Sequence, residues 1–436
     1  MSAAAEVMRA EPGELEAHSR KRLTLCLIGT ADSTHVAARA RCFVEMGHRI
    51  YLITETASLG GIDGVTELVP ALDRDLARKF WFRLILWGCG KLGGRTVDDA
   101  WRVIAFIRLL RQCRPDIVHV HFAYSYYGWL AGLLSCRPLV VTVMGGDVLF
   151  EEQGNPTPVG KWLTLELLRK ADYITSKSDY LTEVLDRLGG FGRKAERIVW
   201  GVAVTKFRRV DAAELRWSLG LATDQRVILS PKILRPLYRV HLVVEAMAAV
   251  SRAVPEAILL ITEYLPDADY RSQIAQLVER LGLGNHVKFC GRIEHTEMPR
   301  YYSLSEMVVA VPSSDGLPQT LLESMACETP NLLSMLPRYQ EIVQHEQSAY
   351  FVEATAAAIA DGIIRLLKDA GLCARLARNA LEIVRREGDL AEQARRVERR
   401  YQELAETIRP RVVSASGLLA AWRSFREMRQ RQQKIS

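Results

Sequence analysis

Residues 311–327 read VPSSDGLPQTLLESMAC, and this stretch decides how the second half of the chain folds. An apolar run that ends at Val311 predicts a buried strand, and the apolar positions after Pro318 recur at helical spacing. Between strand and helix, Gly316 can adopt backbone angles that a side chain would forbid, so the loop can approach a ligand closely. Free amide groups at the start of the helix would offer a binding place for a diphosphate.

The alternation of short apolar strands with amphipathic helices continues on both sides of this stretch. The N-terminal half begins with a strand at 23–29, a helix over 33–46 and a strand at 50–54, which together form a βαβ unit. Further strands are predicted at 117–121, 139–143, 173–175 and 198–200. In the C-terminal half, strands at 227–230, 258–262, 287–290, 307–311, 331–334 and 349–352 alternate with helices at 240–252, 270–281, 297–304, 318–327 and 355–368.

This order of elements predicts an α/β protein with two Rossmann-like domains, each an open, mostly parallel sheet covered by helices on both faces. Such sheets bind ligands beyond the carboxyl ends of their strands, so we expect a ligand cleft where the domains face each other. Charged amphipathic helices follow at 372–387 and 390–408. We divide the chain into a polar leader (1–21), an N-terminal domain (22–205), a C-terminal domain (206–385), a closing helix (386–409) and a basic tail (410–436).

The composition excludes several other classes of protein. The 436 residues are 49% hydrophobic and 25% charged, which excludes general disorder. The eight cysteines are scattered without a CxxC motif, so we expect neither a zinc site nor a thioredoxin-type motif, and such thiols fit a reducing cytosol. The leader has no apolar core, and no run of 18 apolar residues occurs, so neither a secretory signal nor a membrane-spanning helix is expected.

One stretch of the chain is strongly basic. Residues 74–114 carry ten arginines and lysines against three aspartates, which equals the whole net charge of +7. At helical spacing Phe80, Leu84 and Trp87 share one face, as in a helix that lies in a membrane interface. A core helix whose arginines reach the solvent is the alternative, and no other feature supports nucleic acid as a partner. We predict binding to anionic membranes through 78–111, with 418–434 as a second candidate, and a cytoplasmic protein at the inner face of the plasma membrane.

Five side chains at predicted strand ends or helix starts could carry chemistry. Asp315 and Glu323 are eight residues apart, and their carboxylates could accept hydrogen bonds from sugar hydroxyls. Alternatively, Asp315 caps the helix and Glu323 is solvated. Lys232 and Arg235 follow the first strand of the C-terminal half and could neutralise a diphosphate, or could be two solvated loop cations. His121 ends an apolar strand, where a histidine is commonly structural.

Taken together, these pieces resemble the retaining family-four glycosyltransferases of the GT-B fold. That family has a carboxylate, seven residues and then Glu-Ala-Met-Ala-Cys-Gly-Thr-Pro, and this chain has Asp315 followed by Glu323-Ser-Met-Ala-Cys-Glu-Thr-Pro330. The likeness runs over about residues 22–405, and its motifs occur in the family's order. The other matching segments are the loop 31–35, the strand 116–121 (DIVHVH), the turn 145–147 (GGD), the segment 200–207 and the motif 291–302 (GRIEHTEMPRYY).

The resemblance implies transfer of a sugar, with retention, from a nucleotide-diphosphate sugar to a glycan or a lipid-linked acceptor. It implies attack on the same face of the sugar, assisted by the leaving phosphate, with no cofactor and no metal. The DxD triplets at 73–75 and 267–269 are read as solvated acids. By resemblance, the diphosphate is bound by Lys232, Arg235, Gly316 and Leu317, the base by Arg292 and its neighbours, and the ribose by Glu323. The transferred sugar is bound by Asp315 and His121, and the acceptor side is formed by Gly29, His35 and Asp147.

The chain also departs from the family pattern. Glu328 and Arg338 replace common glycines, Ala203 replaces an aspartate, Asp315 stands where many members have glutamate, and 262–264 (TEY) replaces a Gly-x-Gly. An anion at Glu328 would oppose donor binding if it lay near the phosphates. Two alternatives therefore stay open: a nucleotide-sugar epimerase of the same fold, and a non-catalytic relative that binds nucleotide sugar or membrane.

Overall fold

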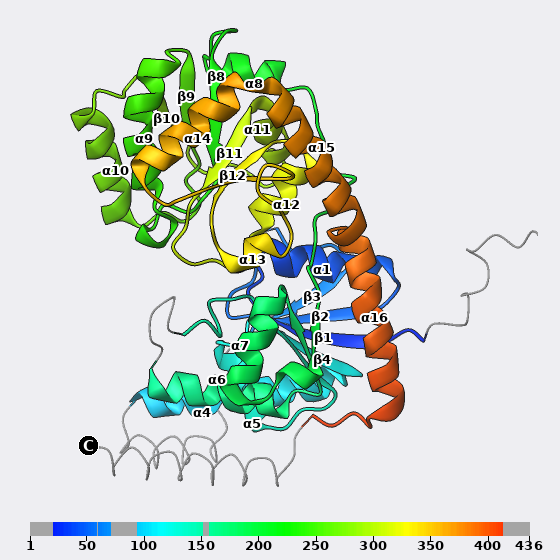
Figure 1. Ribbon diagram of the computed structural model, residues 1–436. Helices are drawn as coiled ribbons and strands as arrows, with labels where there is room; N and C mark the ends of the chain where they lie inside the picture. Colours follow the sequence, from blue (N-terminus) through cyan, green and yellow to red (C-terminus); the bar gives the residue numbers. More distant parts are fainter. Residues whose placement is uncertain (1–20, 59, 71–93, 151–156, 413–436) are drawn as a thin grey trace, which may run out of the picture.

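The structure is a computed structural model that describes residues 21–58, 60–70, 94–150 and 157–412, with side chains of 94–101 left aside. Two α/β units lie one above the other, and a long helical segment runs down one side of both (Figure 1). The predicted leader, most of the basic tail and the basic stretch 74–93 lie outside the described residues, apart from Lys21 and 410–412.

The N-terminal unit is a parallel seven-stranded sheet in the order β3-β2-β1-β4-β5-β6-β7. β4 and β5 are buried along their whole length, as expected of central strands with helices on both faces. The strands are β1 (Thr24–Ile28), β2 (Arg49–Ile53), β3 (Val65–Leu68), β4 (Ile117–His121), β5 (Leu139–Thr142), β6 (Tyr173–Ser176) and β7 (Ala195–Arg197). The helices are α1 (Thr34–Glu45), α4 (Gly94–Cys113), α5 (Tyr126–Leu133), α6 (Pro158–Lys170) and α7 (Asp179–Gly189).

The C-terminal unit is a parallel six-stranded sheet in the order β10-β9-β8-β11-β12-β13. Its strands are β8 (Arg226–Ser230), β9 (Ala257–Ile261), β10 (Val287–Phe289), β11 (Met307–Ala310), β12 (Asn331–Ser334) and β13 (Tyr350–Val352). Its helices are α8 (Ala213–Ser218), α9 (Val240–Ala253), α10 (Ala268–Arg280), α11 (Met298–Leu304), α12 (Gln319–Ala326), α13 (Pro337–Gln340) and α14 (Ala356–Lys368). Short 3-10 turns η1 (Gly192–Lys194) and η2 (Pro236–Tyr238) complete the described elements.

Each sheet separates two apolar cores, because successive side chains of a strand point to opposite faces. In β8, Ile228 packs into one core while Val227 and Leu229 pack into the other. The arrangement confirms the predicted fold class of two Rossmann-like domains followed by C-terminal helices. One predicted strand is wrong: residues 198–200 lie outside the sheet, and β7 instead ends at Arg197. Trp200 has a left-handed φ of 47°, which takes the backbone away from the strand direction.

The chain crosses between the two units twice at one place. Helix α15 (Ala370–Glu387) packs on the C-terminal sheet, and helix α16 (Leu390–Thr407) packs into a core of the N-terminal sheet. At the crossing, the Val202 amide donates to the Gly388 carbonyl at 2.7 Å, and the Leu390 amide donates to the Val202 carbonyl at 3.1 Å. A Cβ on Gly201 would lie 1.6 Å from the Gly388 carbonyl oxygen, so the two crossing segments touch backbone to backbone.

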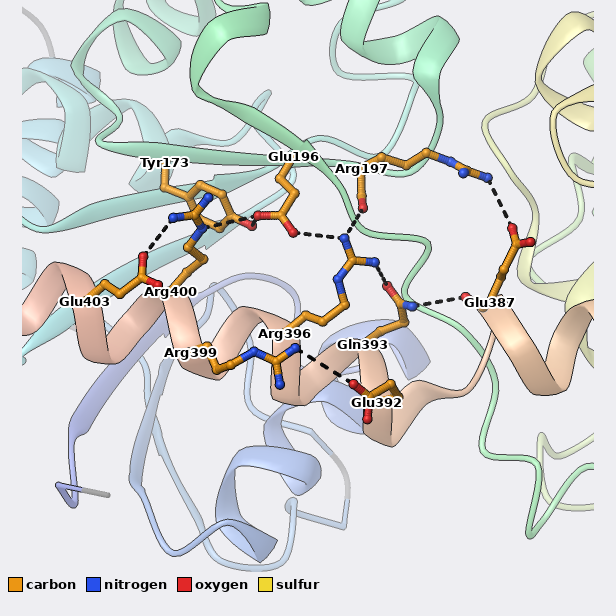
Figure 2. A network of polar contacts seen from close by, with 10 residues as sticks. All are labelled: Tyr173, Glu196, Arg197, Glu387, Glu392, Gln393, Arg396, Arg399, Arg400 and Glu403. Atoms are coloured by element: carbon orange, nitrogen blue, oxygen red, sulfur yellow. Dashed lines mark hydrogen bonds and ion pairs between the residues drawn. The ribbon is translucent and has the colours of Figure 1, made fainter. Parts of the chain in front are cut away.

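A polar network also attaches α16 to the N-terminal sheet (Figure 2). Glu196 of β7 accepts hydrogen bonds from Arg396 at 2.9 Å, from Arg400 at 3.3 Å and from the Tyr173 hydroxyl at 2.9 Å. Although partial burial acts in the opposite direction, these donors lower the pKa of Glu196 below its ordinary value. A single exposed ion pair contributes little, but two arginines of α16 that share one carboxylate of β7 hold the helix against the sheet.

Candidate functional site

A cavity of about 560 Å³ lies between the two units, at the carboxyl ends of their strands. This is where parallel sheets of this type bind ligands. Seven of the residues predicted from the sequence line it: His35, Lys232, Arg292, Asp315, Gly316, Leu317 and Glu323.

Lys232 and Asp315 meet because they follow neighbouring strands, β8 and β11. The Lys232 ammonium lies 2.7 Å from Asp315 Oδ2 and is 5% exposed, and the Tyr339 hydroxyl donates to the same oxygen at 3.0 Å. Asp315 does not cap the helix, since α12 begins after Pro318 without a side-chain cap. The carboxylate therefore holds a buried cation at the cavity wall, and within the described residues two ammonium hydrogens stay available to a ligand.

Glu323 is 3% exposed on the second turn of α12, so it is not a solvated acid. His295 Nε2 lies 2.7 Å from one carboxylate oxygen, and the Tyr302 hydroxyl donates to the other at 2.9 Å. Burial alone would lower the pKa of His295, but the bond to Glu323 outweighs burial and raises it above its ordinary value. Each oxygen of Glu323 keeps a further lone pair with which it can accept a ligand hydroxyl.

The second predicted cation is not where we expected it. Arg235 is exposed in the turn before η2 and is not part of the cavity wall. Instead Lys177, which follows β6 and is 4% exposed, lines the cavity from the N-terminal unit and donates to the Leu317 carbonyl at 3.3 Å. Burial, followed by the charge of Arg39, lowers the pKa of Lys177 to about 7. Like Lys232, Lys177 comes shortly after a predicted strand, and this position in the sequence could have identified it as a cation of the cavity wall.

Gly316 lines the cavity, and its lack of a side chain also serves a contact between the two units. A Cβ at this position would lie 2.4 Å from the Met144 carbonyl oxygen of the N-terminal unit. The glycine therefore allows the loop after β11 to touch the loop after β5. Asp147, which was predicted on the acceptor side, is fully buried and lies outside both cavity walls. It accepts hydrogen bonds from the amides of Met144, Gly145 and Ala123 at 2.7–2.9 Å, and so fixes the loop that meets Gly316.

A second cavity, of about 360 Å³, lies in the N-terminal unit beside the first and shares His35, Phe122 and Met144 with it. Gly29 and His121 also line it, as does Arg39. His121 is buried at the end of β4, and burial, His119 and Arg39 keep its pKa well below the ordinary value. The smaller cavity thus contains the predicted acceptor-side residues Gly29 and His35 together with His121.

His119, two residues earlier in β4, is fully buried and has partners on both sides. It bonds the Tyr401 hydroxyl of α16, and its Nε2 lies 2.7 Å from the Thr142 hydroxyl. The first contact belongs to the packing of α16 against the sheet, and the second joins the neighbouring strands β4 and β5.

The departures from the family pattern lie away from the larger cavity or leave it open. Glu328 follows the C-terminal end of α12, opposite the end that faces the cavity, and its φ of 58° explains why glycine is common there. Arg338 is buried, donates to Ser314 at 3.1 Å and lies 5.3 Å from the Tyr180 ring of the N-terminal unit. Tyr264, in the segment that replaces Gly-x-Gly, lines the cavity with the Arg292 guanidinium 5.7 Å from its ring.

Two further expectations concern metals and membranes. Within the described ranges, no three side chains of the metal-binding types lie together, and Asp267 of one DxD triplet caps α10 through the Tyr270 amide at 2.8 Å. Across those same ranges, no helix is both long and apolar enough to cross a bilayer. In α4, Phe106 and Leu110 pack in the core, so the membrane prediction now rests on 78–93 and 418–434, outside the described residues.

Comparisons with known proteins extend over most of the chain. Residues 211–383 match the family model of glycosyl transferases group 1, and residues 33–206 match that of glycosyltransferase family 4. The N-acetyl-alpha-D-glucosaminyl L-malate synthase of Bacillus anthracis is 24% identical over 273 residues, which are 62% of this chain and 70% of that protein.

Solved structures show the same fold. Anabaena HepE, crystallised in complex with UDP and glucose, superposes with a TM-score of 0.72 at 17% identity, covering 88% of this chain and 100% of that chain. Sucrose-phosphate synthase from Thermosynechococcus elongatus superposes with a TM-score of 0.72 at 20% identity, covering 89% and 100%. These likenesses confirm the predicted arrangement of two sheets around an interdomain cleft.

Proposed function

This chain belongs to the group 1 glycosyltransferases of family four, which are retaining enzymes of the GT-B fold, and on that premise we propose how its two cavities divide the substrates. The larger cavity binds the nucleotide-diphosphate sugar and the smaller one binds the acceptor. The observation that carries this proposal is the buried Lys232–Asp315 pair, which shares one cavity with Lys177 and Glu323.

The cations act on the leaving group. As the bond to the sugar breaks, negative charge develops on the diphosphate oxygens, and fixed donors that bind this charge more strongly in the transition state accelerate the step. Lys232 and Lys177 approach from opposite domains, and the amides of Gly316 and Leu317 precede α12 between them. Arg235 is exposed outside the cavity and does not take part in binding the diphosphate in this proposal.

The remaining cavity residues orient the donor. Glu323, held by His295 and Tyr302, accepts the ribose hydroxyls, and Asp315 accepts hydroxyls of the transferred sugar while it keeps Lys232 in place. Tyr264 and Arg292 form an aromatic and cationic wall for the base. Attack from the same face, assisted by the leaving phosphate, accounts for retention without a covalent nucleophile. The UDP bound by HepE makes uracil the first base to test.

The acceptor is a glycan or a lipid-linked molecule. Support for the lipid-linked class comes from the basic and aromatic composition of 78–93 and 418–434, which would bring a cytoplasmic enzyme to anionic lipid at the inner face of the plasma membrane. Flotation with anionic and neutral vesicles tests this part by itself. Equal recovery with both kinds of vesicle would contradict it.

The central experiment is a thermal-shift screen with UDP-, GDP- and ADP-sugars on the full chain. A nucleotide sugar at about 100 times its dissociation constant should stabilise the chain by about 2.7 kcal/mol. Lys232→Ala should remove most of that shift, whereas Lys368→Ala, an exposed lysine at the end of α14, should leave it intact. Nuclear magnetic resonance of the product then gives its anomeric configuration. An unchanged shift in Lys232→Ala, or an inverted product, would refute the assignment, and deuterium incorporation from solvent would favour an epimerase.

A further inference from the structure

The smaller cavity contains a buried cation that the proposed reaction does not use. Arg39 lies on α1, lines this cavity and is only 1% exposed. Its guanidinium lies 3.0 Å from His121 Nδ1, 3.6 Å from the Met144 sulfur and 4.2 Å from the centre of the Trp200 ring. None of these groups is an anion, and in the described part of the chain no carboxylate pairs with Arg39.

The contact with Arg39 determines which ring nitrogen of His121 carries the hydrogen. A guanidinium has only donors, so His121 Nδ1 must accept, and Nε2 therefore carries the ring hydrogen. That Nε2 is buried and has no hydrogen-bond partner among the described residues. His121 thus presents an unused N–H donor in the same cavity as Arg39.

A third unused polar group lies in the same wall. The Ser125 hydroxyl is buried without a partner in the described structure, and it does not cap α5, which begins at the next residue. Tyr126 and Tyr127 line the cavity as well, so the start of α5, the positive end of its helix dipole, lies at this part of the wall. Of the described lining residues, Glu55 carries a carboxylate, and it is exposed. The wall is consequently rich in donors and positive at its buried end.

Burying a cation and several donors without acceptors is unfavourable, unless a ligand supplies the missing charge and oxygens. We propose that this cavity is an anion-binding subsite in which Arg39, His121 Nε2 and Ser125 hold a phosphate or carboxylate group. Both anions match the planar fork of arginine, which can donate two parallel hydrogen bonds to them. Because the two cavities share His35, Phe122 and Met144, the anion belongs to the acceptor, an interpretation that rests on the proposed function.

The experiment is calorimetric titration of the full chain with inorganic phosphate and, separately, with malonate at matched ionic strength. We expect saturable binding of at least one of them, weakened at least tenfold in Arg39→Gln. The matched control is Arg41→Gln, which removes an exposed arginine from the same helix and should bind like the wild type. Lys232→Ala, which impairs the donor cavity, should keep this anion binding. Preference for phosphate or for malonate then identifies the anion on the acceptor.

Two milder variants decide the matter if Arg39→Gln does not fold. Arg39→Lys keeps the charge without the fork and should bind with intermediate affinity, and Ser125→Ala should bind several-fold more weakly. Equal binding by the wild type, Arg39→Lys and Ser125→Ala, no binding of either anion by the wild type, or loss of binding in Lys232→Ala would overturn the inference. A failure of nucleotide sugars to bind would contradict the proposed function while leaving the anion result standing.

Discussion

The charge of Lys177 should depend on whether the donor is bound, and this can be measured as a proton count. Burial and Arg39 lower the pKa of this lysine to about 7, so about half of the free enzyme carries the charge at pH 7 and about a tenth at pH 8. A bound diphosphate would place negative charge in the same cavity and raise the pKa back toward its ordinary value. Binding should therefore draw about 0.9 proton from solution at pH 8 and about 0.5 at pH 7.

The assay is titration calorimetry of the nucleotide sugar in two buffers of different ionisation enthalpy at pH 8. The difference in apparent enthalpy gives the number of protons taken up. Lys177→Met keeps the apolar stem of the side chain and should lower the uptake to nearly zero. His295→Gln is the control for the histidine that contacts Glu323, and it should leave the uptake at the wild-type value.

A second consequence follows from the same pKa. Above pH 7.5, the affinity of the wild type for the donor should fall about tenfold per pH unit. The reason is that each pH unit lowers about tenfold the fraction of free enzyme in which Lys177 is charged. The affinity of Lys177→Met should be weaker and nearly flat over this range. Uptake below about 0.3 proton by the wild type at pH 8, or equal uptake by Lys177→Met, would refute the argument that burial keeps Lys177 largely neutral.

Three other predictions concern the frame of the site. Gly316→Ala should reduce transfer at least tenfold in an activity assay, because its Cβ would lie 2.4 Å from the Met144 carbonyl oxygen and would force the two loops apart at the cavity. Glu328→Gly should raise the free energy of unfolding by about 1 kcal/mol, because it relieves a φ of 58°. Glu196→Ala should cost about 1 kcal/mol at neutral pH. Since the pKa of Glu196 is lowered, that cost should disappear as the pH falls through it, which urea unfolding at several pH values checks.

The fold could be predicted because its central strands are continuous apolar runs. β4, β5, β8 and β11 are buried along most of their length, and each was expected within about a residue of its observed bounds. The edge strand β3 was not predicted. Its sequence VTEL is half-exposed and contains too few apolar residues to distinguish it from a loop. In the N-terminal sheet, apolar pattern therefore locates the central strands more reliably than the edge strands β3 and β7.

The site could be predicted where backbone topology alone brings residues together. Lys232 and Asp315 meet because β8 and β11 are neighbours, and Glu323 faces the cavity because it lies near the start of α12. Arg235 could not be assigned this way, since it is three residues farther along an irregular turn whose path decides whether a side chain enters the cavity. Its predicted role in binding the diphosphate remains a prediction that the geometry does not favour.

Arg39 shows what a closer reading of helical spacing could have found. Val36, Ala40 and Phe43 recur at helical spacing and form the buried face of α1, and Arg39 lies on that same face. An arginine on the apolar face of a helix is unusual enough to ask what its partner is. The sequence cannot answer that question, because the partners come from β4, from the loop after β5 and from the crossing at Trp200.

The distribution of charge suggests how the enzyme would select its acceptor. In the larger cavity, Asp315 and Glu323 already accept hydrogen bonds from protein groups, so both carboxylates are compensated before any ligand arrives. In the smaller cavity the reverse holds, because the partners of Arg39 among the described residues are all neutral. A neutral acceptor would leave that charge buried and unpaired, whereas an anionic one would compensate it. The enzyme would then reject a neutral acceptor mainly because its binding leaves the Arg39 charge buried and unpaired. Removing that charge should therefore be enough to relax the selectivity for the acceptor.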